Sequence, residues 1–382
     1  MDWDPEIDTP ATILIIGGNA IGIEAALYAR FLGYSVIVAD AARVGNKLLA
    51  ASDEPMPGTW EELATPLGLA ALETQNAGAT EAMRGENSAS VPTHKDYVEQ
   101  YLIPVAKTDL IYESVEINSP VQSVSRSEVS AASRLGVEEL AEREFRVLIN
   151  SAKRGAHSQV VDIVLDCVGL PNVQGSAMGG GLACGEAEIL ALDSENQTAS
   201  GFFTYTSLGT LRAEAGKSIM LYGDSEEVIE TVRRLHGEME DATGARLLWL
   251  VPMGSQVLQD EETKNLSEAF VAGFSTIPIW GVENIAEKED GGWQLRVQSS
   301  LDEMLDLECD AFASCLLQAE GAEQATRELL AGSKVATTDP HYYLLQDQLG
   351  KAEVNRSQVR EVFALIGGRA DLDLYATVQV PD

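Results

Sequence analysis

Two short runs of apolar residues near the start of the chain enclose a segment with a helical composition. Residues 12–16 (Thr-Ile-Leu-Ile-Ile) and 35–39 (Ser-Val-Ile-Val-Ala) are continuous and rich in β-branched side chains, which is typical of strands buried on both faces. Between them, residues 23–32 form a good helix sequence that Gly33 ends. The pattern therefore predicts strand, helix and strand in the order of a Rossmann unit.

The turn between the first strand and the helix carries candidate binding chemistry. In such a turn the first glycine permits a tight bend, the last lets the helix pack closely on the strand, and the free N–H groups of the helix attract a pyrophosphate. Asp40, at the end of the second strand, can accept hydrogen bonds from a ribose diol. Asn19 departs from the pattern, because the middle position is normally glycine, although asparagine tolerates unusual φ angles. The predicted dinucleotide site comprises Gly17, Gly18, Asn19, Ala20, Ile21, Gly22 and Asp40.

The same pattern returns about two hundred residues later in the chain. Residues 217–223 are predicted as a strand, 224–235 as a helix and 246–251 as the next strand. Further strands are predicted after each unit, at 145–150 and 160–168 and at 282–287 and 293–297. The repeat predicts an α/β fold with two Rossmann-like three-layer dinucleotide-binding domains, each with a β-meander.

The second copy has lost much of its binding chemistry. Asp224, Glu226 and Glu227 stand where a pyrophosphate would lie, and their charges repel it. Val228 replaces the last small residue of the turn, and no acid follows the strand at 246–251. We therefore expect a retained fold, with NAD(P)H binding disfavoured.

With both halves in view, the sequence resembles the FAD-dependent pyridine nucleotide oxidoreductases, the broad group of disulfide-reductase-like and monooxygenase-like flavoproteins. The resemblance covers nearly the whole chain. It is carried by residues 15–18 through Asp40, by 65–72, by Asp166-Cys167-Val168-Gly169 in the place of that group's Ala-Thr-Gly strand end, and by 363–369. It implies that 363–369 is the last FAD strand with its Gly-Asp motif, and that 372–377 is a helix whose N-terminus faces the flavin.

The resemblance also implies the domain order and three further FAD residues. The chain would leave the FAD domain and return to it, giving an FAD domain of residues 1–205 and 335–382 with an inserted, degenerate NAD(P)-binding-like domain of 206–334. Gly169, Gly368 and Arg369 would contact the cofactor. Arg369 stands where the group has an aspartate, so it could pair with phosphate but could not accept a hydrogen bond.

The charge balance excludes several classes of partner. The 382 residues include 60 acidic and 26 basic ones, a net charge of −34, and such a surface repels nucleic acid. No apolar run approaches the roughly 18 residues that a membrane-spanning helix needs. The acidic first residues, 1–6, lack the features of a secretory signal, which favours a cytoplasmic protein. The oligomeric state is left open, with a homodimer among the alternatives.

The cysteines and histidines supply no metal or redox motif. Cys167, Cys184, Cys309 and Cys315 show no C-x-x-C spacing, and the four histidines are scattered. We therefore expect no metal site and no disulfide reduction through an internal cysteine pair.

Three other segments hold weaker candidates. The glycines at 179–181 either approach the cofactor or form a flexible loop. Thr93 is predicted to cap a helix that places His94 on the surface. Residues 341–343 (His-Tyr-Tyr) line the flavin pocket or, as we favour, pack as aromatic side chains.

Two classes of function are compatible with these features. The first is an FAD-dependent oxidoreductase of unidentified substrate, in which the flavin carries the electrons and no catalytic residue can be named. The second is a non-catalytic nucleotide-binding protein, a sensor or scaffold, whose cofactor motifs have eroded. A third alternative, a dehydrogenase that uses NAD alone, would leave the motif at 363–377 without a purpose.

Overall fold

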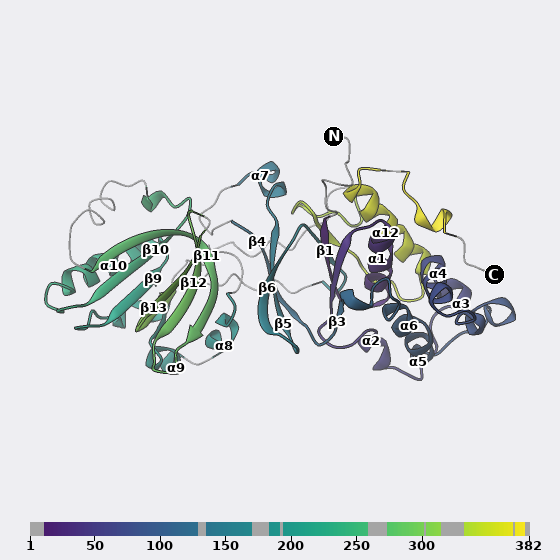
Figure 1. The fold of residues 1–382 in the computed structure, drawn as a ribbon, viewed down its shortest axis with the longest axis horizontal. Coiled ribbons are helices and arrows are strands. Elements are labelled where there is room, and N and C mark those ends of the chain that lie inside the picture. The colour runs from purple at the N-terminus through teal and green to yellow at the C-terminus, as the bar shows by residue number, and fades with distance from the viewer. Residues whose placement is uncertain are drawn as a thin grey trace. The chain divides into compact units, whose positions relative to one another are not determined.

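A computed structural model describes residues 11–128, 135–169, 183–191, 194–258, 273–301, 303–314, 332–369 and 371–378 (Figure 1). The chain divides into two compact units. The first comprises residues 1–121, 140–171 and 327–382, and the second comprises 122–139 and 172–326. The longer segment of the second unit begins at 172. It includes β8 (Phe202–Thr204), which pairs within the sheet of this unit.

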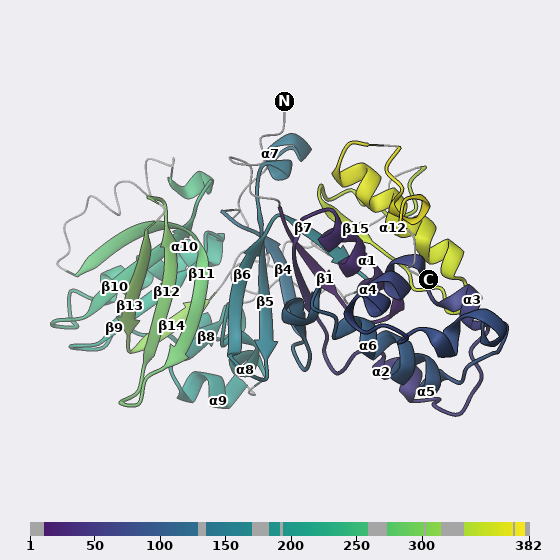
Figure 2. The ribbon, with the colours of Figure 1, turned by 45° about the vertical axis from the view of Figure 1, so that its right-hand side comes forward.

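A parallel sheet forms the centre of the first unit. Its described strands lie in the order β15-β7-β1-β2-β3, and every neighbouring pair is parallel. Figure 2 labels β15, β7 and β1. They are β1 (Thr12–Ile16), β2 (Ser35–Ala39), β3 (Val115–Glu116), β7 (Ile163–Asp166) and β15 (Tyr342–Leu344). The strands and helix predicted at the start of the chain are confirmed. Since β1 has β2 on one side and the much later β7 on the other, the strand order reverses beside β1.

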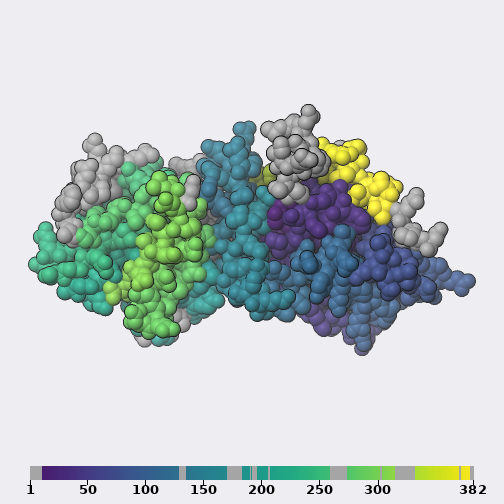
Figure 3. All heavy atoms as spheres, viewed as in Figure 1, coloured from purple at the N-terminus to yellow at the C-terminus, as the bar shows by residue number. Residues whose placement is uncertain are grey.

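Helix α1 (Ala20–Phe31) connects β1 to β2 and packs on α12 (Ala352–Ile366). The rings of Tyr28 and Phe363 stack with their centroids 4.9 Å apart, and Figure 3 shows the yellow C-terminal residues beside the purple N-terminal ones. The remaining helices of this part are α2 (Asn46–Leu49), α3 (Trp60–Leu63), α4 (Pro66–Gln75), α5 (His94–Tyr97) and α6 (Ile103–Ala106). An antiparallel hairpin of β5 (Phe145–Ser151) and β6 (Gly155–Val161) completes the first unit. The elements β4 (Val121–Arg126) and α7 (Val137–Ala141) lie at the unit boundaries.

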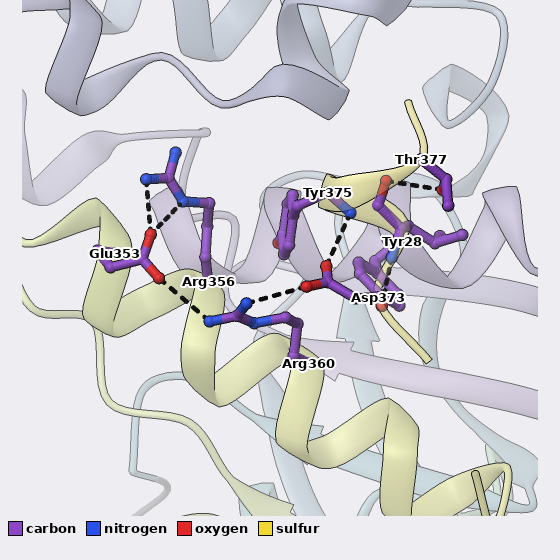
Figure 4. Close-up of polar contacts among 8 residues, drawn as sticks. Tyr28, Glu353, Arg356, Arg360, Asp373, Tyr375 and Thr377 are labelled. Atoms are coloured by element: carbon purple, nitrogen blue, oxygen red, sulfur yellow. Dashed lines mark hydrogen bonds and ion pairs between the residues drawn. The ribbon is translucent and has the colours of Figure 1, made fainter. Parts of the chain in front are cut away.

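The strand predicted at 363–369 is wrong, because residues 363–366 are the last turn of α12. Val359, Val362 and Phe363 are fully buried, and their spacing of three and four residues matches a helix face. The chain then folds back along this helix (Figure 4), where Arg360 donates to the carboxylate of Asp373 at 3.0 Å. The helix predicted at 372–377 is reduced to the short 3₁₀ turn η7 (Leu374–Ala376).

The second unit is built on a larger, mixed sheet. Its order is β13-β12-β11-β10-β9-β14-β8, and the predicted strand, helix and strand of the repeat are present as β9, α10 and β10. Bounds are β9 (Ser218–Tyr222), β10 (Arg246–Pro252), β11 (Phe274–Glu287), β12 (Trp293–Ser299), β13 (Met304–Cys309), β14 (Ala311–Ser314), α8 (Glu186–Leu190), α9 (Ser194–Ala199) and α10 (Glu226–Glu238). β11 pairs in parallel with β10 and antiparallel with β12, so the α/β unit and its meander share one sheet.

Candidate functional site

A groove of about 660 Å³ lies at the carboxyl ends of the strands in the first unit. Four neighbouring parallel strands contribute to its lining. Ile16 and Ala39 are the last residues of β1 and β2, and Cys167 and Leu345 directly follow β7 and β15. The strand order reverses here, which is where open α/β sheets bind their ligands. Its volume is within the range of small-molecule sites.

Two glycines of the predicted turn are required by sterics. Gly17 has a φ of +109°, and a Cβ on it would lie 2.4 Å from Cγ1 of Val168. A Cβ on Gly22 would lie 2.0 Å from the carbonyl oxygen of Gly17. Gly17 therefore makes the tight bend and Gly22 lets α1 approach β1, which are the mechanical tasks that the sequence predicts for them.

Asn19 is the N-cap of α1 and lines the groove. Its Oδ1 accepts the Gly22 N–H at 2.9 Å, while its Nδ2 donates to the carbonyl of Cys167 at 2.8 Å. The φ angle of Asn19 is −84°, an ordinary value, so tolerance of unusual φ is not the reason for asparagine here. The side chain instead ties the start of α1 to the end of β7.

Asp40 holds the turn together from the end of β2. Gly18 N–H donates to its Oδ2 at 2.6 Å, and Ala42 N–H donates to its Oδ1 at 2.8 Å. A carboxylate offers about four lone-pair directions, so each oxygen can still accept a further donor from the groove. Asp40 can thus serve the turn and a ribose diol at once.

Asp347 is a groove residue that sequence reasoning missed. It follows β15, and Asn355 donates to its Oδ1 at 2.9 Å. Burial raises the pKa of this carboxyl, against the opposing effect of hydrogen bonds from Asn355 and from the Ala20 backbone N–H at the start of α1. The available signal was an apolar run followed by an acid, the same pattern as β2 and Asp40. Lys47, exposed on α2, adds a positive charge to the groove.

The other predicted site residues fall into three groups. Gly169 lines the groove, and its N–H donates to Oδ1 of Asp166 at 2.9 Å. Ala20 and Ile21 form the first turn of α1 and do not line the groove. Gly368 and Arg369 follow the end of α12 and do not line the groove, so their contact with a cofactor stays a prediction. Arg369 lies 3.7 Å from Asp371.

The structure also describes most of the weaker candidates from the sequence. Thr93 caps α5 as predicted, but His94 is buried rather than on the surface, since it packs within the helical layer. Tyr342 and Tyr343 are buried in β15, and the Tyr342 hydroxyl donates to Asp166 at 2.9 Å, which confirms the packing role. The glycines at 179–181 lie outside the described residues.

Glu24 is a buried acid that shares a small cavity with Asp347. Glu24 on α1 is 5% exposed, and its Oε2 accepts the hydroxyl of Thr65 at 2.7 Å. Burial raises the pKa of Glu24 to about 7, against the hydrogen bond from Thr65. A cavity of about 30 Å³, roomy enough for a water molecule, is lined by both Glu24 and Asp347. Glu24 can therefore hold or release a proton near neutral pH.

The corresponding turn of the second unit is closed by its own side chains. The N-cap Ser225 accepts the Val228 N–H at 3.3 Å, and the carbonyl of Gly223 accepts the indole N–H of Trp249 at 2.9 Å. Val228 is fully buried in an apolar cluster. Glu226 and Glu227 occupy the first helical turn, so their negative charges surround the end of the helix that would attract a phosphate.

Comparison with known proteins finds solved structures that resemble the chain at low sequence identity. No protein-family model and no curated protein matches the chain. A bacillithiol disulfide reductase from Bacillus cereus is 15% identical, over 80% of this chain and 77% of its own, with a TM-score of 0.30. A thioredoxin reductase from Gloeobacter violaceus is 12% identical over 98% of both chains, with a TM-score of 0.31. The FAD-bound cadaverine monooxygenase DfoA from Erwinia amylovora is 10% identical over 98% and 97%, with a TM-score of 0.38.

The described part of the chain contains neither a metal-binding cluster nor a membrane-spanning helix. It holds no group of three or more His, Cys, Asp or Glu residues placed to bind a metal ion. None of its helices has the length and apolar character needed to cross a membrane.

Replacing Gly22 by alanine tests the close approach of α1 to β1. The new Cβ would meet a backbone oxygen, so we expect Gly22→Ala to lower the free energy of unfolding by about 1–3 kcal/mol, the cost of overpacking. Gly237→Ala in α10 is the matched control, because its Cβ would meet nothing within 4 Å and a helical alanine stabilises by up to about 1 kcal/mol. Denaturant unfolding measures both. A Gly22→Ala protein as stable as its parent would contradict the packing described.

Proposed function

We propose that this chain is an FAD-dependent oxidoreductase whose first unit holds the cofactor. The observation that carries the proposal is the groove at the reversal of strand order, which a glycine turn and Asp40 border directly. The residues fit a dinucleotide by three features: a cradle at Gly17 and Gly18, an acceptor for ribose at Asp40, and a positive charge at Lys47. The choice of FAD over NAD rests on the resemblance of the sequence motifs.

The bound flavin would supply the electron-carrying chemistry, and this chain's residues would hold and orient it. Electron transfer through an internal dithiol is not part of the proposal. The sequence contains no C-x-x-C spacing, and burial raises the pKa of the Cys167 thiol well above its usual value. Reducing equivalents would therefore pass between the flavin and its substrate directly.

A nucleotide-binding protein without turnover is the second candidate. It is favoured by the way the chain already satisfies the start of α1. Asn19 caps the helix with its side chain, and the Asp347 carboxylate accepts from the Ala20 N–H, where a phosphate would otherwise be attracted. A sensor or scaffold could retain this groove without supporting catalysis.

The visible absorption spectrum of the purified protein, followed by identification of any released chromophore, tests the proposal. We expect a flavin spectrum and released FAD, or uptake of added FAD by colourless protein, because the groove retains the turn and the ribose acceptor. Turnover with candidate substrates then separates an enzyme from a scaffold. Colourless protein that fails to take up FAD would overturn the proposal, and bound NAD without flavin would select an NAD-dependent enzyme.

NADH and NADPH are expected to reduce the flavin-loaded protein poorly. Like charges about 4 Å apart repel by about 1 kcal/mol even in bulk water, while the helix dipole offers about 0.3–1 kcal/mol at an exposed terminus. The carboxylates at the start of α10 should therefore outweigh the dipole. Anaerobic mixing with each nucleotide measures the rate of flavin bleaching, with dithionite as the control reductant. Rapid bleaching at micromolar nucleotide would show that the second unit binds it after all.

A further inference from the structure

The first unit contains a second large cavity, of about 500 Å³, which we call the basic pocket. It lies between the loop after β2, the end of α6, strand β3 and the turn between β5 and β6. No residue lines both this pocket and the dinucleotide groove. The basic pocket is therefore separate from the proposed dinucleotide site.

The charge of the basic pocket is opposite to that of the chain. Basic side chains are outnumbered by 60 to 26 in the sequence, yet four of them line this pocket together with two acids. One basic residue, Arg154, is paired with Glu116. The remaining basic side chains have no hydrogen bond or ion pair with any residue in the part of the chain that the structure describes; they are Arg43, Lys107 and Lys153.

Three unpaired cations around one cavity repel one another, and an anion placed between them would relieve that repulsion. Lys107, Lys153 and Arg43 are exposed, so solvent screens them and they would not make a site by themselves. What distinguishes them from scattered surface charges is the concave, partly apolar surface that they border.

The floor of the basic pocket combines apolar side chains with a buried hydroxyl. Val44 and Ala106 are buried beneath it, while Tyr112 and Ile117 at its edge are 62% and 44% exposed. Ser151 is 4% exposed, and its oxygen accepts the Lys153 N–H at 3.3 Å, which leaves the hydroxyl proton to donate. The pocket thus offers cations, a donor and an apolar wall, and bare inorganic phosphate would leave the apolar wall exposed.

We infer that the basic pocket binds a small organic anion, in which a carboxylate, phosphate or sulfonate group is joined to an apolar body. Its volume suits a small molecule rather than a macromolecular surface. The site is separate from the dinucleotide groove, so the inference goes beyond the proposed function and does not depend on flavin binding.

Titration with anilinonaphthalene sulfonate, a fluorescent anion with an apolar body, tests the inference. The test protein is the double variant Lys107→Gln/Lys153→Gln, and the control is Lys95→Gln/Lys334→Gln, which changes the net charge equally at exposed lysines outside both cavities. We expect the first double variant to weaken dye binding by about tenfold or more, and the second to leave it unchanged. Octanoate should displace the dye, whereas octanol and acetate should not, because both the charge and the apolar body are needed.

Three results would overturn the inference. Unchanged dye affinity in Lys107→Gln/Lys153→Gln would remove the pocket as the site. Equal weakening in both double variants would show general electrostatic attraction instead. Weakening in Lys47→Gln, with none in the Lys107→Gln/Lys153→Gln protein, would place the dye in the dinucleotide groove. Thermal unfolding of each variant establishes that the fold is retained, and all substituted lysines are exposed.

Discussion

The close packing of α1 against the turn that follows β1 is the constraint on which the candidate site depends. The α-carbon of Gly22 lies so near the carbonyl oxygen of Gly17 that no side chain fits between them. This approach places the start of α1 over the carboxyl ends of the parallel strands. Asn19 and Asp40 then fix the turn through hydrogen bonds to the backbone and to the end of β7. The groove is therefore shaped by contacts within the protein itself.

The protein's own side chains also compensate the charge at the start of α1. The positive end of the α1 dipole is partly compensated by the chain's own Asp347, so a phosphate must share this position with a carboxylate. Lys47 lowers the resulting repulsion, and burial already raises the pKa of Asp347, which makes its neutral form more accessible. In the second unit the chain's own groups compensate the helix start more completely. Carboxylates occupy the first turn of α10, and Val228 fills the position of close approach.

Local patterns along the chain predicted the parts of this structure that local chemistry determines. The strand, turn and helix at 12–32 follow from β-branched runs and glycines with defined steric tasks, and the repeat revealed the second α/β unit. The strand expected at 363–369 failed because four consecutive apolar residues fit the last turn of a helix as well as a strand. Glu24 could not be predicted because its environment is made by long-range packing that no nearby residue signals. Asp347 does follow a short apolar run, but its proximity to the start of α1 also depends on long-range packing. The basic pocket could not be predicted either, because long-range packing brings its cations together from separate segments of the chain.

Hydrogen–deuterium exchange with and without FAD tests the central claim that the first-unit groove is the dinucleotide site. The account predicts slower exchange on FAD addition at residues 17–22, 40–49 and 345–350, which surround the groove. It predicts no change at 223–229, in the turn of the second unit, or at 366–369, beyond the end of α12. Bound FAD that slows exchange at either of those segments, and leaves the groove unaffected, would contradict it.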